Sequence, residues 1–197
     1  MQKKVYYWSP CLNPVGTVKS TINSAIALSK YSNNYNVFVI NSCGEWDNYK
    51  SLFSNHSISL INLNFNYYKY LPKTGFIGSR LSYFIIFIFS FFPLLFLLKK
   101  EKPHSFILHL VTSLPLVLLY LFNFESNFIL RISGYPKLNK FRKFLWKISA
   151  EKLKSITCPS KELKSQLEEK NIFVSKKLFY LPDAIISLKE FSKLNNK

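Results

Sequence analysis

Residues 4–41 have the sequence KVYYWSPCLNPVGTVKSTINSAIALSKYSNNYNVFVIN, and this stretch decides the fold class. The apolar run at 4–8 is rich in β-forming residues and ends at a Ser-Pro pair, which predicts a short buried strand. Apolar residues then recur at helical spacing over 18–31, and a second β-type run follows at 36–41. A strand, a helix and a strand without hairpin-length turns indicate a parallel pair joined by a right-handed crossover.

The same alternation extends along the rest of the chain. We predict further strands at 57–63, 105–110, 127–132, 155–158 and 178–181, and helices at 83–98, 114–124, 139–153 and 161–170. This series predicts an α/β fold with a doubly wound, Rossmann-like, mostly parallel sheet of about seven strands and helices on both faces. We assign residues 1–186 to this single domain and residues 187–197 to a polar tail or the start of an interdomain linker.

The chain is strongly basic, with a formal net charge of +17. Only three of its 27 basic residues are arginines, at positions 80, 131 and 142, whereas proteins that read phosphates and bases favour the arginine fork. The sequence is also rich in Asn, Ile and Phe, which indicates a general compositional bias. We therefore expect no nucleic-acid partner. An anionic membrane surface, which attracts lysines, is the more plausible polyanion.

The three cysteines, at positions 11, 43 and 158, have no metal-ligand or redox-motif spacing. Free thiols in a reducing compartment are the simplest interpretation. The apolar run near the N-terminus stops after four residues, at Ser9-Pro10, which is too short for the core of a signal peptide. We therefore expect the chain to be cytoplasmic.

The middle of the chain is unusually apolar, with no charged residue from 83 to 98. A helix of this length spans about 24 Å, against about 30 Å of membrane hydrocarbon, and the stretch contains Pro93. A core or monotopic helix is therefore favoured here and at 114–124. We expect peripheral association with the inner face of the cell membrane, since lysines lie between the two apolar segments. A small integral membrane protein, in which the two segments form a hairpin, is the alternative.

A set of landmarks recurs at the ends and beginnings of these predicted elements. In chain order they are Pro14-Val15-Gly16-Thr17 before a helix, Lys102-Pro103-His104 before a strand that carries His109, Ser133-Gly134 after the next strand, Cys158-Pro159-Ser160, and Leu181-Pro182-Asp183-Ala184. Their order resembles the N-terminal, acceptor-binding half of GT-B glycosyltransferases of the family-4 type, over roughly residues 3–186. The sequence departs from that pattern in having one glycine, Gly16, where the family has two, and His104 where the family has Asp.

The resemblance implies a glycosyltransferase that transfers a sugar from a nucleotide sugar to a glycan or lipid-linked acceptor, in cell-surface polysaccharide biosynthesis. In such retaining enzymes the donor phosphate assists departure, and neither a metal nor another cofactor is needed. The nucleotide sugar would be a co-substrate bound mainly by a C-terminal donor-binding domain, which is absent from these residues. The chain alone would then be weakly active or inactive. A non-catalytic half that binds a glycan or lipid and pairs with a separate donor-binding chain is the alternative.

The catalytic residues are not identifiable, but six residues are candidates for the acceptor cleft. Gly16 and Thr17 open a helix, where free backbone N–H groups and the helix dipole favour an anion. His109 lies near the end of the predicted strand 105–110 and can orient an acceptor hydroxyl, although a satisfied core histidine is an equal alternative.

The other three candidates lie at the end of the next strand, where ligands of such sheets bind. Ser133 and Gly134 are expected to face the cleft. Arg131 would either reach an anionic acceptor, such as a lipid pyrophosphate, or pair with an acidic neighbour.

Overall fold

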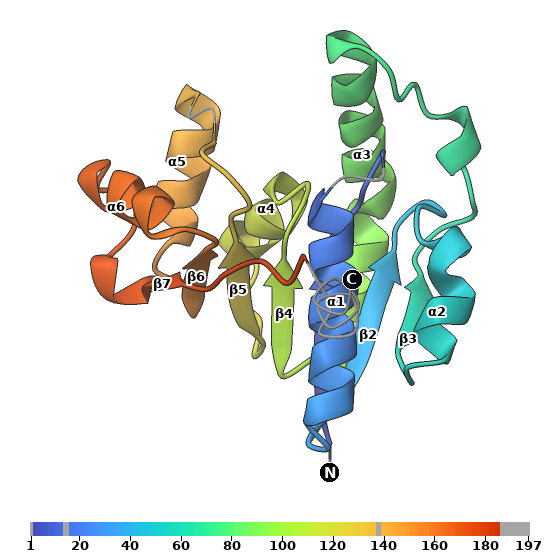
Figure 1. Ribbon diagram of the computed structural model, residues 1–197. Helices are drawn as coiled ribbons and strands as arrows, with labels where there is room; N and C mark the ends of the chain where they lie inside the picture. Colours follow the sequence, from blue (N-terminus) through green and yellow to red (C-terminus); the bar gives the residue numbers. More distant parts are fainter. Residues whose placement is uncertain (1, 14–15, 137–138, 186–197) are drawn as a thin grey trace, which may run out of the picture.

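The structure is a computed structural model that describes residues 2–13, 16–136 and 139–185. Within them, seven strands form one sheet in the order β3-β2-β1-β4-β5-β6-β7 (Figure 1). The strands are β1 (Lys3–Trp8), β2 (Tyr35–Asn41), β3 (Ser59–Asn62), β4 (Ser105–Leu108), β5 (Asn127–Arg131), β6 (Ser155–Cys158) and β7 (Leu178–Tyr180). Every adjacent pair is parallel, which confirms the predicted doubly wound α/β fold.

The helices lie on both faces of the sheet. They are α1 (Gly16–Tyr31), α2 (Lys50–Ser54), α3 (Phe76–Glu101), α4 (Ser113–Leu121), α5 (Lys140–Ser149) and α6 (Lys161–Glu169). In Figure 1, α1 and α2 cover the front face, and α3 and α4 lie behind the sheet. Strand order reverses between β1 and β4, so that the carboxyl ends of these strands form the switch point at which such sheets bind ligands.

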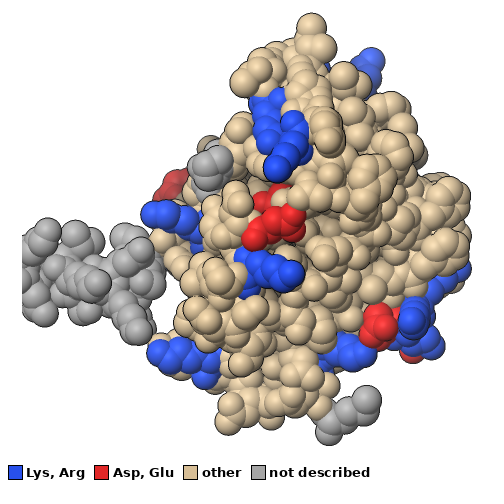
Figure 2. Space-filling view, turned by 90° about the vertical axis from the view of Figure 1, so that its right-hand side faces the viewer, with Lys and Arg blue, Asp and Glu red and all other residues tan. Residues whose placement is uncertain are grey.

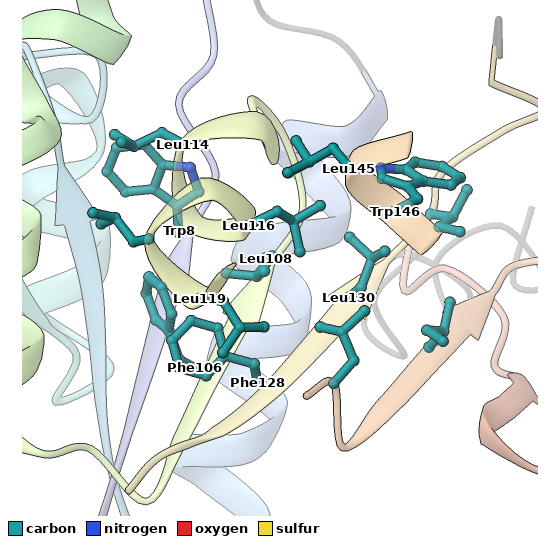
Figure 3. Close-up of a cluster of buried hydrophobic side chains, with 14 of the residues drawn as sticks. Trp8, Phe106, Leu108, Leu114, Leu116, Leu119, Phe128, Leu130, Leu145 and Trp146 are labelled. Carbon is teal, nitrogen blue, oxygen red and sulfur yellow. The ribbon is translucent and has the colours of Figure 1, made fainter. Parts of the chain in front are cut away.

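The larger core cluster lies between β4, β5 and the helices behind them (Figure 3). Phe106 and Phe128 pack edge to face, with ring centroids 5.3 Å apart. From α4, Leu114, Leu116 and Leu119 point into this cluster and are fully or almost fully buried. The apolar surface of α4 is therefore mostly core, which was one of the two interpretations favoured for 114–124.

The transmembrane hairpin considered above is wrong. The strand β4 separates α3 from α4 in the chain, and it lies inside the sheet, paired with β1 on one side and β5 on the other. Its residues Phe106 and Leu108 are completely buried. Two helices with a central strand between them cannot form a hairpin through a bilayer.

Helix α3 has 26 residues, so it is longer than the predicted segment 83–98. Pro93 lies inside it and does not end it. By length and composition alone α3 could cross a membrane, and a third of its apolar window is buried inside the protein. Leu94, Leu95 and Leu98 pack in the core, so the C-terminal half of the helix is part of the domain.

The segment 42–56, to which no regular structure was assigned, contains a 3₁₀ turn (Asp47–Tyr49) that runs into α2. Helix α2 has only five residues, and its only buried residue is Phe53, so it lacks the repeated apolar spacing by which a helix is recognised. The proposed tail at 187–197 lies outside the described residues.

Candidate functional site

A cavity of about 510 Å³ lies at the carboxyl ends of β4 and β5. Its walls come from the loop between β4 and α4, the loop between β5 and α5, the beginning of α5 and one residue of α3, Tyr83. Of the six predicted residues, four line the cavity: His109, Arg131, Ser133 and Gly134. Gly16 and Thr17 do not.

The loop between β4 and α4 is held by Trp8, the last residue of β1. The backbone N–H of His109 donates to the Trp8 carbonyl at 2.9 Å, and the indole Nε1 donates to the Val111 carbonyl at 3.2 Å. Val111 has a φ of 46°, in the left-handed region that a β-branched residue rarely adopts. Such backbone strain is typical of functional loops that the surrounding structure holds in place.

His109 is 5% exposed and lies between α1 and the cavity. Its Nδ1 is 2.9 Å from the Thr21 hydroxyl, which also donates to the Thr17 carbonyl at 2.9 Å. Because that carbonyl only accepts, this arrangement favours Nδ1 as the donor to Thr21 and leaves Nε2 with a free lone pair. Nε2 is buried without a hydrogen-bond partner in the described part of the chain, in a residue that lines the cavity.

The imidazole of His109 is neutral near pH 7. Burial, and then the charge of Arg131, lower its pKa to about 4, although Asp183 acts in the opposite direction. A neutral imidazole with this pKa is a hydrogen-bonding group for a hydroxyl rather than a strong base.

Arg131 pairs with an acidic neighbour, which was one of the two alternatives from the sequence. Its guanidinium Nη2 lies 2.6 Å from Oδ1 of Asp183 and 2.8 Å from the Ser20 hydroxyl, and its Nε donates to the same carboxylate oxygen at 3.0 Å. Both charged side chains are largely buried. These contacts join β5 to α1 and to the segment after β7. Arg131 therefore holds these elements together at the carboxyl edge of the sheet.

Gly16 and Thr17 are the first residues of α1. Gly16 is exposed, and an added Cβ there would meet nothing within 4 Å. The Thr17 hydroxyl is buried without a partner among the described residues. The Thr17 carbonyl accepts from the Thr21 hydroxyl, which in turn contacts His109. Pro14 and Val15, the other residues of this motif, lie outside the described residues.

Several cavity residues were not predicted from the sequence: Tyr83, Thr112, Ser113, Asn139 and Arg142. Thr112 and Ser113 begin α4, while Asn139 caps α5 by accepting from the Arg142 backbone N–H at 2.8 Å. Polar residues at predicted helix starts were therefore a signal that could have found them. Tyr83 carried no such signal, because it lies within an apolar run.

Because His109 is neutral in the folded protein, the free energy of unfolding should depend on pH. Its pKa of about 4 lies below the ordinary value of 6.5, so the unfolded chain binds a proton that the folded chain does not. Stability present above pH 6.5 is therefore lost as the pH falls towards 4, by about 3 kcal/mol in full and about 2 kcal/mol by pH 5. We expect His109→Gln to lack this loss in urea unfolding at pH 7 and 5. His104→Gln, at an exposed histidine, is the control, and parallel profiles for wild type and His109→Gln would contradict the prediction.

By sequence, the chain matches no protein-family model and no curated protein. By structure it is similar to UDP-GlcNAc 2-epimerase from Neisseria meningitidis bound to UDP-GlcNAc (TM-score 0.61, 13% identity, 99% of this chain and 50% of that one). It is also similar to UDP-GlcNAc 2-epimerase from Methanocaldococcus jannaschii (TM-score 0.52, 14% identity, 94% and 46%). A lipopolysaccharide outer core galactosyltransferase in its apo form matches with TM-score 0.51 and 12% identity, over 91% of this chain and 44% of that one.

These proteins have the GT-B fold, and at such identities the similarity shows the fold alone. The chain spans about half the length of each matched structure. It is therefore a GT-B half-domain of the N-terminal type, with its cavity at the carboxyl edge of the sheet.

Proposed function

We propose that this chain is the acceptor-binding half of a retaining, family-4-type GT-B glycosyltransferase. It binds a glycan or lipid-linked acceptor that receives a sugar from a nucleotide sugar, in cell-surface polysaccharide biosynthesis. The donor-binding half lies outside these residues, in a longer polypeptide or in a separate chain.

The observation that carries the proposal is the cavity with the unpartnered Nε2 of His109. This nitrogen accepts a hydrogen bond from the acceptor hydroxyl and so fixes its direction of attack. No Asp or Glu is among the described residues of the lining, and His109 is a weak base. Such a site suits a reaction in which the donor phosphate, rather than a protein carboxylate, assists departure and accepts the proton.

A 2-epimerase is the second candidate, because the structural similarity to the Neisseria epimerase is higher than that to the galactosyltransferase. Epimerisation at C2 requires a group that removes the C2 proton, and the described lining offers no carboxylate for this. Transfer is therefore the better supported function.

Residues 1–197 alone should show little or no transfer from any nucleotide sugar. Adding the separately expressed donor-binding half should restore transfer, and His109→Ala should then lower its rate about a hundredfold through loss of orientation. The measurement is radiolabel transfer to membrane extracts, with UDP-GlcNAc in D₂O as a parallel arm. Robust turnover by the chain alone would refute the incomplete-site proposal, and deuterium at C2 would favour the epimerase.

We also propose that the domain lies on the cytoplasmic face of an anionic membrane. The outer face of α3 exposes Phe89, Phe92 and Phe96, which are 50–65% exposed, and Lys99 and Lys100 follow at its end. In Figure 2, the right-hand half of the view is the α3 side of the molecule. Its surface is almost free of charged residues, and Lys and Arg lie above and below it. Apolar insertion flanked by lysines is the pattern of a monotopic surface helix.

Co-sedimentation with liposomes tests this placement. We expect binding to anionic vesicles that weakens but persists at high salt, because salt screens the lysines and leaves the apolar contact. Phe92→Ser/Phe96→Ser should abolish the salt-resistant part. If the chain binds neither anionic nor neutral vesicles, the outer face of α3 belongs to a protein interface instead.

A further inference from the structure

Different faces of helix α3 are buried in its N-terminal and C-terminal halves. An α-helix turns by about 100° per residue, so residues 18 apart point in the same direction, about five turns on. Phe76 thus shares its direction with Leu94, and Ile77 shares its direction with Leu95. The two leucines are buried in the core, whereas Phe76 is 66% and Ile77 80% exposed. The face that packs on the domain in the C-terminal half of α3 is therefore bare in the N-terminal half.

The N-terminal half of α3 is held by a different face. Ser82 donates to the Pro72 carbonyl at 2.6 Å and Ser79 donates to the Lys73 carbonyl at 3.3 Å, so this half packs on the segment that precedes it. Figure 1 shows it rising above the carboxyl edge of the sheet. We define the α3 overhang as Phe76, Ile77, Tyr83 and Phe84, which lie on the bare face.

The α3 overhang is continuous with the cavity, because Tyr83 belongs to both. Two helix N-termini contribute to the lining of the same cavity. Helices α4 and α5 both begin on it, and neither has an acidic residue in its first turn. Their N-terminal N–H groups and dipoles therefore favour an anion, and Arg142 adds a positive charge to the lining.

The cavity also contains a buried polar atom that lacks a partner. His109 is 95% buried (5% exposed), lines the cavity and has an Nε2 without a hydrogen-bond partner in the described part of the chain. A buried imidazole nitrogen without a partner costs stability unless something binds it.

We propose that the acceptor is an amphipathic phosphate ester, with its phosphate between the N-termini of α4 and α5 and its hydrocarbon chain on the α3 overhang. This inference rests on the proposed acceptor-binding function and names the class of acceptor. The occupant follows from the continuity of the two surfaces: a site for an anion opens onto a helix face that exposes apolar side chains, among which the Arg80 guanidinium lies 3.6 Å from the Phe76 ring centroid.

Binding of farnesyl phosphate to the full chain tests this proposal, with farnesol and inorganic phosphate as the two halves of the ligand. We expect farnesyl phosphate to bind at least about tenfold more tightly than either, because each contributes only one of the two contacts. Intrinsic tryptophan fluorescence or equilibrium dialysis gives the dissociation constants.

Variants separate the two contacts. Ile77→Ser/Phe84→Ser in the α3 overhang should weaken farnesyl phosphate about tenfold and leave inorganic phosphate unchanged. Arg142→Gln should weaken both phosphate ligands and leave farnesol unchanged. Phe92→Ser/Phe96→Ser, on the outer face of the same helix, is the matched control and should have no effect. All of these side chains are exposed, so each variant should fold, which circular dichroism checks.

Equal binding of farnesol and farnesyl phosphate would overturn the proposal, and so would an equal loss in the control variant. A dimer that Ile77→Ser/Phe84→Ser dissociates, or protection of the overhang only by the donor-binding half, would assign this face to a protein instead. Transfer to a soluble glycan without binding of farnesyl phosphate would refute this inference and leave the proposed function standing.

Discussion

Replacing Asp183 by asparagine is expected to lower the free energy of unfolding by about 3–5 kcal/mol, because it leaves the buried guanidinium of Arg131 without its charge partner. The carboxylate accepts two hydrogen bonds from Arg131, at 2.6 and 3.0 Å, and a third from the Ser20 hydroxyl at 3.1 Å. An asparagine can keep part of this geometry but not the charge. Urea unfolding at neutral pH measures the loss.

Two further variants sharpen this prediction. Glu125→Gln breaks the exposed ion pair with Lys102 and should cost less than about 1 kcal/mol, since solvent screens such pairs. The double variant Arg131→Met/Asp183→Leu removes both buried charges and should recover most of the stability lost by Asp183→Asn. A loss below about 1 kcal/mol for Asp183→Asn would show that the pair is solvated and does not hold the edge of the sheet.

The second large effect is expected at Trp8, whose side chain is completely buried at the carboxyl end of β1. Trp8→Ala should cost about 3–5 kcal/mol, because it leaves a cavity beside Leu114 (Figure 3). Trp8→Phe keeps much of the packing but loses the hydrogen bond to the Val111 carbonyl, which should cost about 1 kcal/mol in addition to a smaller packing loss.

The site should respond to Trp8→Phe beyond this loss of stability. Without the indole donor, the strained backbone at Val111 can relax, so amide hydrogen exchange should accelerate in residues 109–113. Phe106→Leu, a packing change in the same core, is the control. Exchange in residues 109–113 of this variant should change no more than its loss of global stability accounts for. Unchanged exchange in Trp8→Phe would mean that the loop holds its conformation without the indole.

The order of elements could be predicted from the sequence because each strand and most helices carry a local periodic pattern. The run at 4–8 and the periodicity over 18–31 correspond to β1 and α1, and their ends differ from the structure by only a few residues. Helix α3 was predicted too short. Its first turns contain Gly78 and Arg80, which interrupt the apolar pattern, and the Ser82 hydroxyl joins this part of the helix to the Pro72 carbonyl.

The candidate site was predicted in part, for a topological reason. The carboxyl ends of parallel strands share one edge of a sheet, so the sequence predicts that His109, Arg131, Ser133 and Gly134 lie near one another. All four line the same cavity. The partner of Arg131 was left open, because Asp183 is 52 residues away in the chain and no local pattern pairs them.

The sequence alone predicts the α/β class, the parallel pairing of the strands and the polar residues that end them, since these depend on local periodicity and on the handedness of crossovers. Only the tertiary structure decided which apolar residues are core. The apolar runs of α3 and α4 look alike in sequence, yet α4 is buried against β4 and β5, while half of α3 rises past the edge of the sheet. Burial depends on what lies opposite a side chain, and that is fixed by where the sheet ends rather than by the helix itself.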